Sequence, residues 1–407
     1  MGFNVQDIRA DFPILHQEAY PGRPLIFLDS AASTQKPSKV IEAMANIMER
    51  DYANVHRGVH ILSQRATDIF ESCRAKVASF MSAEEREIVF TKNTTEAINL
   101  VANAWGRSKL KTGDQILITE LEHHANIVPW QLICSETGAD LVVTRIHDDG
   151  TIDLDDFRSK ISSGKVKMFA CAHVSNVLGT VLPLEILIPE AKAAGALTLV
   201  DGSQGITHRK VDVGTIGSDF YVWTAHKLYG PTGIGILYGS YHVLDSMSPW
   251  QGGGDMIASV SFEGSTFKPA PYKFEAGTPA IIEAAGLSAA IDWVESVGIE
   301  NIEKHEAELV VAAHDALAKI EGVKIYGTAP NKASVVSFLC DKAHAHDVGT
   351  LLDRAGIAIR VGHHCAEPLM QRYGLASTAR ASFAAYNTLE EVESLAKAVT
   401  AAQEFFS

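Results

Sequence analysis

The sequence predicts an α/β fold in which a large domain with a mostly parallel sheet precedes a smaller C-terminal α+β domain. Two observations lead to this prediction. As far as about residue 290, short apolar runs rich in β-branched residues alternate with longer helix-like segments, the order typical of a parallel sheet covered on both faces. Beyond that point, a long amphipathic stretch precedes several shorter apolar runs. The 407-residue chain is long enough for about two to three domains.

Five apolar segments are predicted strands of the large sheet, at residues 87–91, 115–119, 167–175, 197–201 and 220–223. Helix-like sequence follows the first three, as TTEAINLVANAW, HHANIVPWQLICSETG and LEILIPEAKAAG. Because neighbouring parallel strands need a crossover connection that is usually a helix, this alternation indicates βαβ units.

The C-terminal part begins with a long amphipathic helix predicted over residues 290–320. The segments ASVVSFLC, IAIRVG and RASFAAYN are predicted to be short strands ahead of a final helix. We expect the large domain to span residues 22–293 and the small domain to combine residues 1–21 with 294–407.

Composition excludes several classes of protein. Asp and Glu number 49 against 35 Lys and Arg, for a net charge of -14, and no basic run is present that could follow a nucleic acid backbone. No apolar run reaches membrane-spanning length, and the N-terminal sequence has no signal-peptide pattern. The 5 cysteines are an odd number without a C-x-x-C pair, which favours a reducing compartment over a disulfide framework. We expect a cytoplasmic protein.

Two charged residues stand at the carboxyl ends of predicted strands, where open α/β sheets hold their ligands. Lys227 follows the strand FYVW and precedes a Gly-rich turn, and Asp201 ends the strand LTLVD. An amine that can form a Schiff base and an acid that can keep a pyridinium nitrogen protonated are what pyridoxal phosphate requires of a protein. The pair predicts this cofactor.

Two further strand ends carry groups that the same cofactor would use. Thr94 and Thr95 place hydroxyls and free N–H groups at a predicted helix start, which suits a phosphate, although Thr is also an ordinary N-cap. His123 follows another strand, where an imidazole could stack on the pyridine ring and exchange protons with the substrate.

The segment RVGHHCAEPLM (360–370) places Cys365 after Arg360, His363 and His364. Cationic or proton-accepting neighbours lower the pKa of a thiol, and the thiolate is both the nucleophile and the metal ligand. From these residues alone Cys365 is a nucleophile, a metal ligand or neither. The other four cysteines lie in apolar, helix-like or strand-like surroundings and are predicted core residues.

The order of motifs resembles that of the Suf-type cysteine desulfurases, which are fold-type I pyridoxal phosphate enzymes of the class V aminotransferase family. The motifs that carry the resemblance run nearly end to end: FLDSAAS, HRGVH, TTEAINLVA, EHHANIVPWQ, HVSNVLGT, VDGSQ, AHKLYGPTGIGILYG, WQGGGDMI, FEAGTPA, RVGHHCAEPLM and RASFAAYN. The resemblance implies a seven-stranded sheet and release of sulfur from L-cysteine, giving L-alanine and a persulfide on Cys365 for iron–sulfur cluster assembly.

The resemblance also implies residue roles for the cofactor. Lys227 is the Schiff-base lysine, Asp201 meets the pyridinium nitrogen, Gln204 meets the ring hydroxyl and His123 stacks on the ring. The remaining cofactor contacts that it implies are Thr95, Thr224, His226, Asn176 and Thr278, of which Thr278 would reach the phosphate of the other subunit in a homodimer. No metal is implied.

For the substrate, the resemblance assigns its carboxylate to Arg380 and Asn176. An Arg fork matches a carboxylate bidentately, which agrees with that assignment. Other predicted substrate contacts are His56, Arg360 and His364. Arg360, His363 and His364 are also expected to raise the thiolate fraction of Cys365.

The segment DKAHAHDVGT (341–350) is predicted to dock a sulfur acceptor, with His344 as the central side chain. A similar H-x-H-D run occurs in desulfurases served by a zinc-containing, SufU-like acceptor, whereas those served by SufE-like acceptors tend to have an aromatic residue in place of His346. The alternative is an ordinary polar loop in which Asp347 caps the following helix.

Two other functions stay open at this point. On the same scaffold the chain could act as a selenocysteine lyase or as a plain aminotransferase. Outside enzymes, it could be a sensor in which His363, His364 and Cys365 hold zinc, but that reading leaves Lys227 and Asp201 unexplained.

Overall fold

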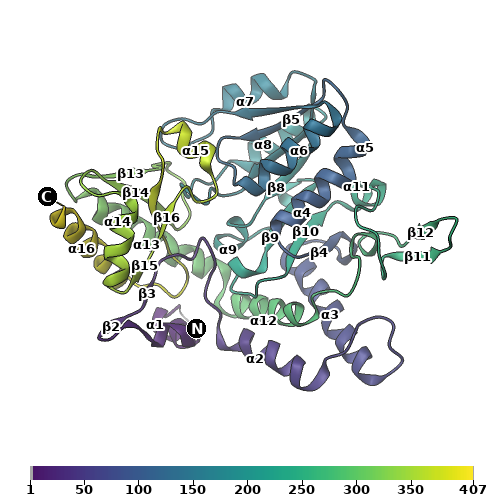
Figure 1. The fold of residues 1–407 in the computed structure, drawn as a ribbon, viewed down its shortest axis with the longest axis horizontal. Coiled ribbons are helices and arrows are strands. Elements are labelled where there is room, and N and C mark those ends of the chain that lie inside the picture. Colours follow the sequence, from purple (N-terminus) through teal and green to yellow (C-terminus); the bar gives the residue numbers. More distant parts are fainter. Residues whose placement is uncertain (1–2, 407) are drawn as a thin grey trace.

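The larger of the two main sheets has seven strands in the order β4-β10-β9-β8-β7-β5-β6 in the computed structural model, which describes residues 3–406 (Figure 1). Strand β10 is antiparallel to both neighbours, and the other pairings in the sheet are parallel. The strands are β4 (Ile88–Thr91), β5 (Gln115–Thr119), β6 (Asp140–Thr144), β7 (Val166–Ala172), β8 (Leu197–Asp201), β9 (Phe220–Thr224) and β10 (Gly235–Gly239). The prediction of an α/β fold with a mostly parallel sheet is confirmed.

All five predicted strands of this sheet are present, and two others were not predicted. Strand β6 lies at the sheet edge and is partly exposed, and its short apolar run at residues 141–143 was overlooked. Strand β10 begins with Gly235, where a Cβ atom would lie 2.5 Å from the Asn93 Cα atom. The glycine therefore allows β10 to pass close to the start of α4.

Helices cover both faces of the large sheet (Figure 1). Alternate residues of β7 show the division: Phe169 and Cys171 pack in one core cluster, and Met168 and Ala170 in the other. The first face is covered by α3 (Ile61–Phe80), α8 (Leu184–Ala193) and α12 (Ile281–Val297), and the second by α4 (Thr94–Val101), α6 (Val128–Thr137) and α11 (Tyr241–Ser246).

The second main sheet is antiparallel, has the order β13-β14-β17-β16, and lies at the left in Figure 1. Its strands are β13 (Val323–Tyr326), β14 (Val335–Cys340), β16 (Arg360–Gly362) and β17 (Thr378–Ser382). A separate core joins it to α13 (Ile299–Ala318), α14 (Ala345–Arg354) and α16 (Leu389–Phe405).

The N-terminal residues lie against this C-terminal part. Arg9, in α1 (Val5–Ala10), donates to the Tyr386 carbonyl and pairs with Glu391 at 2.8 Å. Further along, β3 (Ile26–Phe27) pairs in parallel with β15 (Ile357–Ala358). The remaining elements include β1 (Glu18–Tyr20), β2 (Arg23–Pro24), α2 (Ser38–Asn46), α5 (Arg107–Lys109), α7 (Leu154–Ile161), α9 (Gly205–His208), α10 (Val213–Ile216), β11 (Ile257–Val260), β12 (Ser265–Phe267) and α15 (Glu367–Arg372).

Three C-terminal predictions are corrected by the structure. The single helix predicted over residues 290–320 is two helices that meet at Gly298, whose φ of 86° a helix does not accommodate. The predicted strand IAIRVG is divided into β15 and β16, which pair with different partners. In RASFAAYN only the residues up to Ser382 form a strand.

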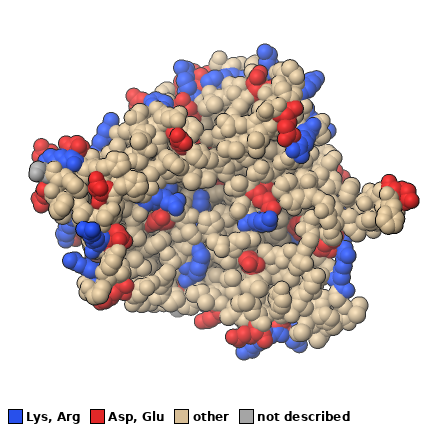
Figure 2. All heavy atoms as spheres, viewed as in Figure 1, with Lys and Arg blue, Asp and Glu red and all other residues tan. Residues whose placement is uncertain are grey.

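The surface carries charged residues of both signs, as the composition leads us to expect. Figure 2 shows Lys and Arg interspersed with Asp and Glu across the visible face. Within residues 3–406, no helix has both the length and the apolar character needed to span a bilayer. The β11–β12 hairpin projects from the body at the right of Figure 1, and the Phe262 side chain near its tip is fully exposed.

Candidate active site

A cavity of about 210 Å³ lies at the carboxyl ends of the parallel strands and at the start of α4. The structure brings eleven of the predicted site residues to its lining: Thr95, His123, Asn176, Asp201, Gln204, Thr224, His226, Lys227, Arg360, His364 and Arg380. The lining also contains Asn93, Thr94 and Ser203. Residues from distant strand ends and from the small sheet therefore meet at one place.

Lys227 ends a single helical turn that directly follows β9. Desolvation lowers the pKa of Lys227 to about 8, and the nearby Asp201 carboxylate opposes that decrease. A substantial fraction of the amine is consequently uncharged near neutral pH, which is the form that attacks a carbonyl or accepts a proton.

Asp201 is the last residue of β8, and Ser203 fixes its carboxylate. The Asp201 Oδ1 atom accepts hydrogen bonds from the Ser203 backbone N–H at 2.9 Å and hydroxyl at 2.6 Å. The Ser203 hydroxyl also lies 2.8 Å from the Thr94 hydroxyl, so β8 and the start of α4 are joined. Sequence reasoning missed Ser203, although a serine two residues after a strand-end Asp is an Asx-turn signal.

His123 lies in the turn after β5, and its Nδ1 atom accepts from the Ala125 N–H at 3.0 Å. Burial lowers the pKa of His123 to about 4, so the ring is neutral at physiological pH. Beneath it Glu122 is buried and accepts from Asn126 and the Ala172 N–H. Burial raises the pKa of Glu122 to about 7. These contacts hold the turn that presents the imidazole.

Four buried polar atoms around the cavity have no hydrogen-bond partner among the described residues: Thr224 Oγ1, His226 Nδ1, His364 Nδ1 and Arg380 Nε. Buried polar groups are normally paired, so their grouping around one cavity indicates a polar ligand. Hydroxyl, imidazole and guanidinium groups, together with the helix start at Thr94 and Thr95, suit phosphate and carboxylate oxygens. The residues present therefore fit pyridoxal phosphate together with an amino acid.

Arg380 is buried in β17, and the protein already orients its guanidinium. One Nη atom donates to the Asn176 carbonyl at 2.8 Å, and the other donates to Asp29 at 3.0 Å. Asp29 was not predicted as a site residue. Fixed in this way, Arg380 keeps its Nε–H free on the cavity side of the residue.

Cys365 lies on the loop that follows β16 and is half-buried, whereas the other four cysteines are buried. His364 and Cys365 have positive φ values of 53° and 55°. Cys365 is close enough to Lys227 and Arg380 to interact with them electrostatically, although burial lowers the pKa of both groups. Cys365 itself is not among the residues that line the cavity, but its neighbour His364 is, so the loop borders the cavity.

Of the two histidines beside Cys365, His364 does not serve as a cation, which corrects that part of the prediction. Burial lowers the pKa of His364 to about 3, and its Nε2 atom lies 2.9 Å from the Thr378 hydroxyl. The His363 Nδ1 atom accepts from the Cys365 N–H at 3.1 Å. Of the three expected cations only Arg360 carries a permanent charge.

The zinc alternative lacks the geometry it needs. Because His364 turns to Thr378 and His363 caps its own loop, the two rings and the thiol do not converge. Within residues 3–406, no group of three or more His, Cys, Asp or Glu side chains is arranged to hold a metal ion.

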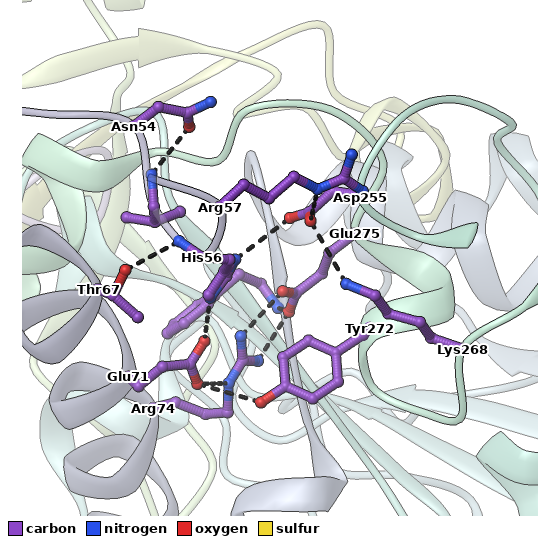
Figure 3. Close-up of polar contacts among 12 residues, drawn as sticks. Asn54, His56, Arg57, Thr67, Glu71, Arg74, Asp255, Lys268, Tyr272 and Glu275 are labelled. Carbon is purple, nitrogen blue, oxygen red and sulfur yellow. Dashed lines mark hydrogen bonds and ion pairs between the residues drawn. The ribbon is translucent and has the colours of Figure 1, made fainter. Parts of the chain in front are cut away.

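His56 is absent from the lining of this cavity. Its ring lies between two carboxylates, 2.8 Å from Glu71 and 3.3 Å from Asp255 (Figure 3). Glu71 in turn accepts from the buried Arg74, which also binds Glu275 through two nitrogens. Within one chain, this ion-pair network engages both ring nitrogens of His56 and keeps the residue outside the cavity where the other predicted site residues meet.

Thr278 is also outside this cavity. It is exposed and lines a second cavity of about 390 Å³ together with Lys92, Trp250 and Glu283. The predicted contact between Thr278 and the phosphate of another subunit would therefore be made from a surface that is exposed in the single chain.

His344 is exposed and forms the N-cap of α14, where its Nδ1 atom accepts from the His346 N–H at 3.3 Å. The two imidazole rings are stacked, with centroids 5.5 Å apart. The alternative in which Asp347 caps this helix is wrong, since Asp347 lies inside the first turn. Both imidazoles are available at the surface.

Known proteins resemble this chain in both sequence and structure. The sequence profile of the aminotransferase class-V family matches residues 26–395. A cysteine desulfurase of Cronobacter sakazakii is 50% identical over 397 residues, which cover 97% of each protein. A cysteine desulfurase of Synechococcus elongatus is 47% identical over 400 residues, and this alignment covers 98% of the chain but 64% of the longer relative.

A crystal structure of the cysteine desulfurase CsdA from Escherichia coli, in an S-sulfonic acid form, superposes with a TM-score of 0.92. It is 40% identical and the match covers 100% of both chains. Sequence and structure comparisons thus point to the same group of proteins.

Proposed function

The chain belongs to the aminotransferase class-V family, and from this premise we propose that it is a cysteine desulfurase that uses pyridoxal 5'-phosphate to transfer sulfur from L-cysteine to Cys365. The observation that carries the proposal is the meeting of Lys227, Asp201 and the Cys365 loop around one cavity whose lining includes four unpartnered polar atoms.

The residues that would hold the cofactor come mainly from strand ends of the large sheet. Asp201 would meet the pyridinium nitrogen, Gln204 the ring hydroxyl and His123 the ring face. The phosphate would be held by Thr95, Thr224 and His226, of which Thr224 and His226 carry unpartnered buried atoms. When bound, pyridoxal phosphate supplies a carbonyl carbon for covalent attachment and a ring that withdraws electrons from the substrate Cα atom.

Lys227 would hold and move the proton at the substrate carbons. With its pKa lowered to about 8, its amine can accept a proton and return it without a large energetic cost in either direction. Arg380 and Asn176 would bind the substrate carboxylate. Arg380 needs no rearrangement, because Asp29 and the Asn176 carbonyl already fix its guanidinium.

Cys365 would supply the nucleophile. Its Sγ thiolate attacks the substrate sulfur, so that a new S–S bond forms while the Cβ–S bond of the substrate breaks. The electron pair of the broken bond stays with the carbon fragment, which takes up a proton and leaves as L-alanine. The product on the protein is a persulfide on Cys365. The outer sulfur of this persulfide can be transferred to a further thiol.

We further propose the Suf type within this group, a homodimer and a cytoplasmic location. The H-H-C loop with Pro368 soon after the cysteine supports the Suf type. In a homodimer, Thr278 and the surroundings of His56 would complete the cavity of the other subunit, since neither reaches the cavity of its own chain.

A zinc-containing, SufU-like acceptor is the partner that the surface at His344 supports best, and iron–sulfur cluster assembly is the process that would use the sulfur. The His344 and His346 rings are exposed and close together. Neutral imidazole is a good zinc ligand, so His344 could replace an acceptor thiolate on the metal and free that thiolate to take the persulfide sulfur.

The test of the proposed activity is to incubate the purified, cofactor-loaded protein with L-cysteine and to quantify alanine and sulfide with and without a thiol reductant. We expect equimolar alanine and sulfide with the reductant, and about one alanine per chain without it, because a persulfide blocks the next turnover. Alanine without any sulfur on Cys365 or in solution would contradict the proposal.

A further inference from the structure

His124 makes two hydrogen bonds to the loop at and just after Cys365. It begins the short turn His124–Asn126 after β5, directly following the predicted ring-stacking residue His123. Its backbone N–H donates to the Cys365 carbonyl at 2.7 Å. Its side-chain Nε2 atom accepts from the Glu367 N–H at 3.0 Å. A residue from the turn after β5 thus binds the two peptide units that flank Ala366, directly after the thiol.

The Cys365 loop depends on such bonds because its backbone is strained. Two successive non-glycine residues, His364 and Cys365, have φ near +55°. A non-glycine residue in this region is strained and persists only where surrounding contacts fix it. On the N-terminal side of the thiol, the Asn176 amide donates to the His364 carbonyl at 2.8 Å. On the C-terminal side, the corresponding side-chain bond comes from His124.

The bond at Glu367 also caps a helix. Glu367 is the first residue of α15 (Glu367–Arg372), so its N–H is one of the donors that have no acceptor within the helix. The imidazole supplies that acceptor only when Nε2 carries no proton. Burial favours the neutral form by lowering the pKa of His124.

We propose that His124 is a positioning residue for Cys365: its Nε2 atom anchors the C-terminal side of the loop so that the thiolate is held in line with the substrate sulfur. The inference rests on the proposed function. His124 does not line the cavity, so it acts through the loop alone. A displacement of about 1 Å in a reacting group can cost up to about a hundredfold in rate.

The experiment compares His124→Ala with His124→Gln in the cofactor-loaded protein. A Gln carboxamide oxygen can reach the position of Nε2 and accept the Glu367 N–H, whereas Ala cannot. In a single turnover with L-cysteine, we expect His124→Ala to form alanine at least about tenfold more slowly with an unchanged KM, and His124→Gln to recover most of the rate. The matched control is Asp153→Ala, which removes a side-chain cap from the start of α7 outside the cavity lining and should leave the single-turnover rate unchanged.

A second measurement does not depend on turnover. Without cysteine present, we expect iodoacetamide to alkylate Cys365 faster in His124→Ala than in the parent protein, with His124→Gln close to the parent, because a loosened loop exposes the thiol. If the parent protein made no alanine, the proposed activity would fail, and the alkylation rates would still test the anchor.

Equal alkylation and turnover in His124→Ala and the parent protein would overturn the inference. It would also fail if Ala and Gln were equally slow, because the acceptor atom would then not be what matters. Should His124→Ala not fold, His124→Asn replaces it, since the Asn side chain is too short for its oxygen to reach the Glu367 N–H.

Discussion

The wall of the cavity that comes from the large sheet is carried on strand ends, whereas the wall that carries Cys365 is a loop with two residues at positive φ. Asp201 and Thr224 are the last residues of buried strands, and Lys227 is one turn beyond. Cys365 is instead held by single hydrogen bonds from His124, His363 and neighbouring groups. A cofactor has to stay in place, whereas the loop of a thiol that, as we propose, delivers sulfur to a partner has to be able to move. The two walls differ accordingly.

The strongest test of the rigid wall is Lys227→Ala. Without the amine, the protein loses both the attachment point for the cofactor and the group that moves the proton, so turnover should fall by more than about a thousandfold. The visible absorbance of the lysine-linked cofactor should disappear together with alanine formation. Substantial activity in this variant would refute the cofactor assignment.

On the loop, Cys365→Ser should separate cofactor binding from sulfur transfer. A hydroxyl is a poor nucleophile toward sulfur, and the cofactor contacts lie on other residues, so sulfur release should fall by more than about a hundredfold while cysteine still changes the spectrum. The measurement is stopped-flow absorbance beside a sulfide assay. Desulfuration at the parent rate would show that another group attacks the sulfur.

His344→Ala tests whether the transfer of sulfur to an acceptor depends on a residue outside both walls of the cavity. His344 is exposed on α14, outside the cavity lining. We expect basal turnover to be unchanged and stimulation by a zinc-loaded, SufU-like acceptor to be lost, as followed by alanine release with and without the acceptor. Equal stimulation of variant and parent would favour a SufE-like partner.

The smallest expected effect concerns the pH dependence of stability. His173 follows β7, is buried beside the Tyr221 hydroxyl, and has its pKa lowered to about 4 by burial. Since an unfolded histidine titrates near 6.5, the unfolded chain binds more protons between pH 6.5 and 4, and stability should fall as pH falls through that window.

The sign and size of this effect can be checked with one variant. Each such histidine contributes at most about 1.4 kcal/mol per pH unit to the slope. Urea unfolding of His173→Gln between pH 6.5 and 5 should show a shallower slope than the parent protein, since Gln does not titrate. An unchanged slope would mean that folding does not lower the pKa of His173.

The strand-end residues could be predicted from sequence because their position follows from the chain itself. An apolar run that ends in Asp201, or that precedes Lys227 by a few residues, places the polar group at the carboxyl edge of the sheet whatever the tertiary details. Ser203 was within reach of the same reasoning, because its bond to Asp201 spans only two residues.

Contacts between distant segments could not be predicted in this way. The bonds from His124 to the loop at Cys365 and Glu367 join residues about 240 positions apart, and the neutral state of His364 follows from burial that no local pattern encodes. The helix break at Gly298 had a local signal, because a glycine stands between two amphipathic stretches. The periodicity of the surrounding helices concealed that signal.

The distribution of thiols makes the folded chain chemically equivalent to a single-cysteine protein. Burial raises the pKa of Cys73 to about 12, that of Cys134 to about 11 and that of Cys340 to about 11, and it raises the pKa of Cys171 as well. A thiol-directed dye would therefore attach with a stoichiometry of one, at Cys365, the position from which we propose that sulfur is transferred. The approach of an acceptor protein could then be followed optically without removing any native cysteine.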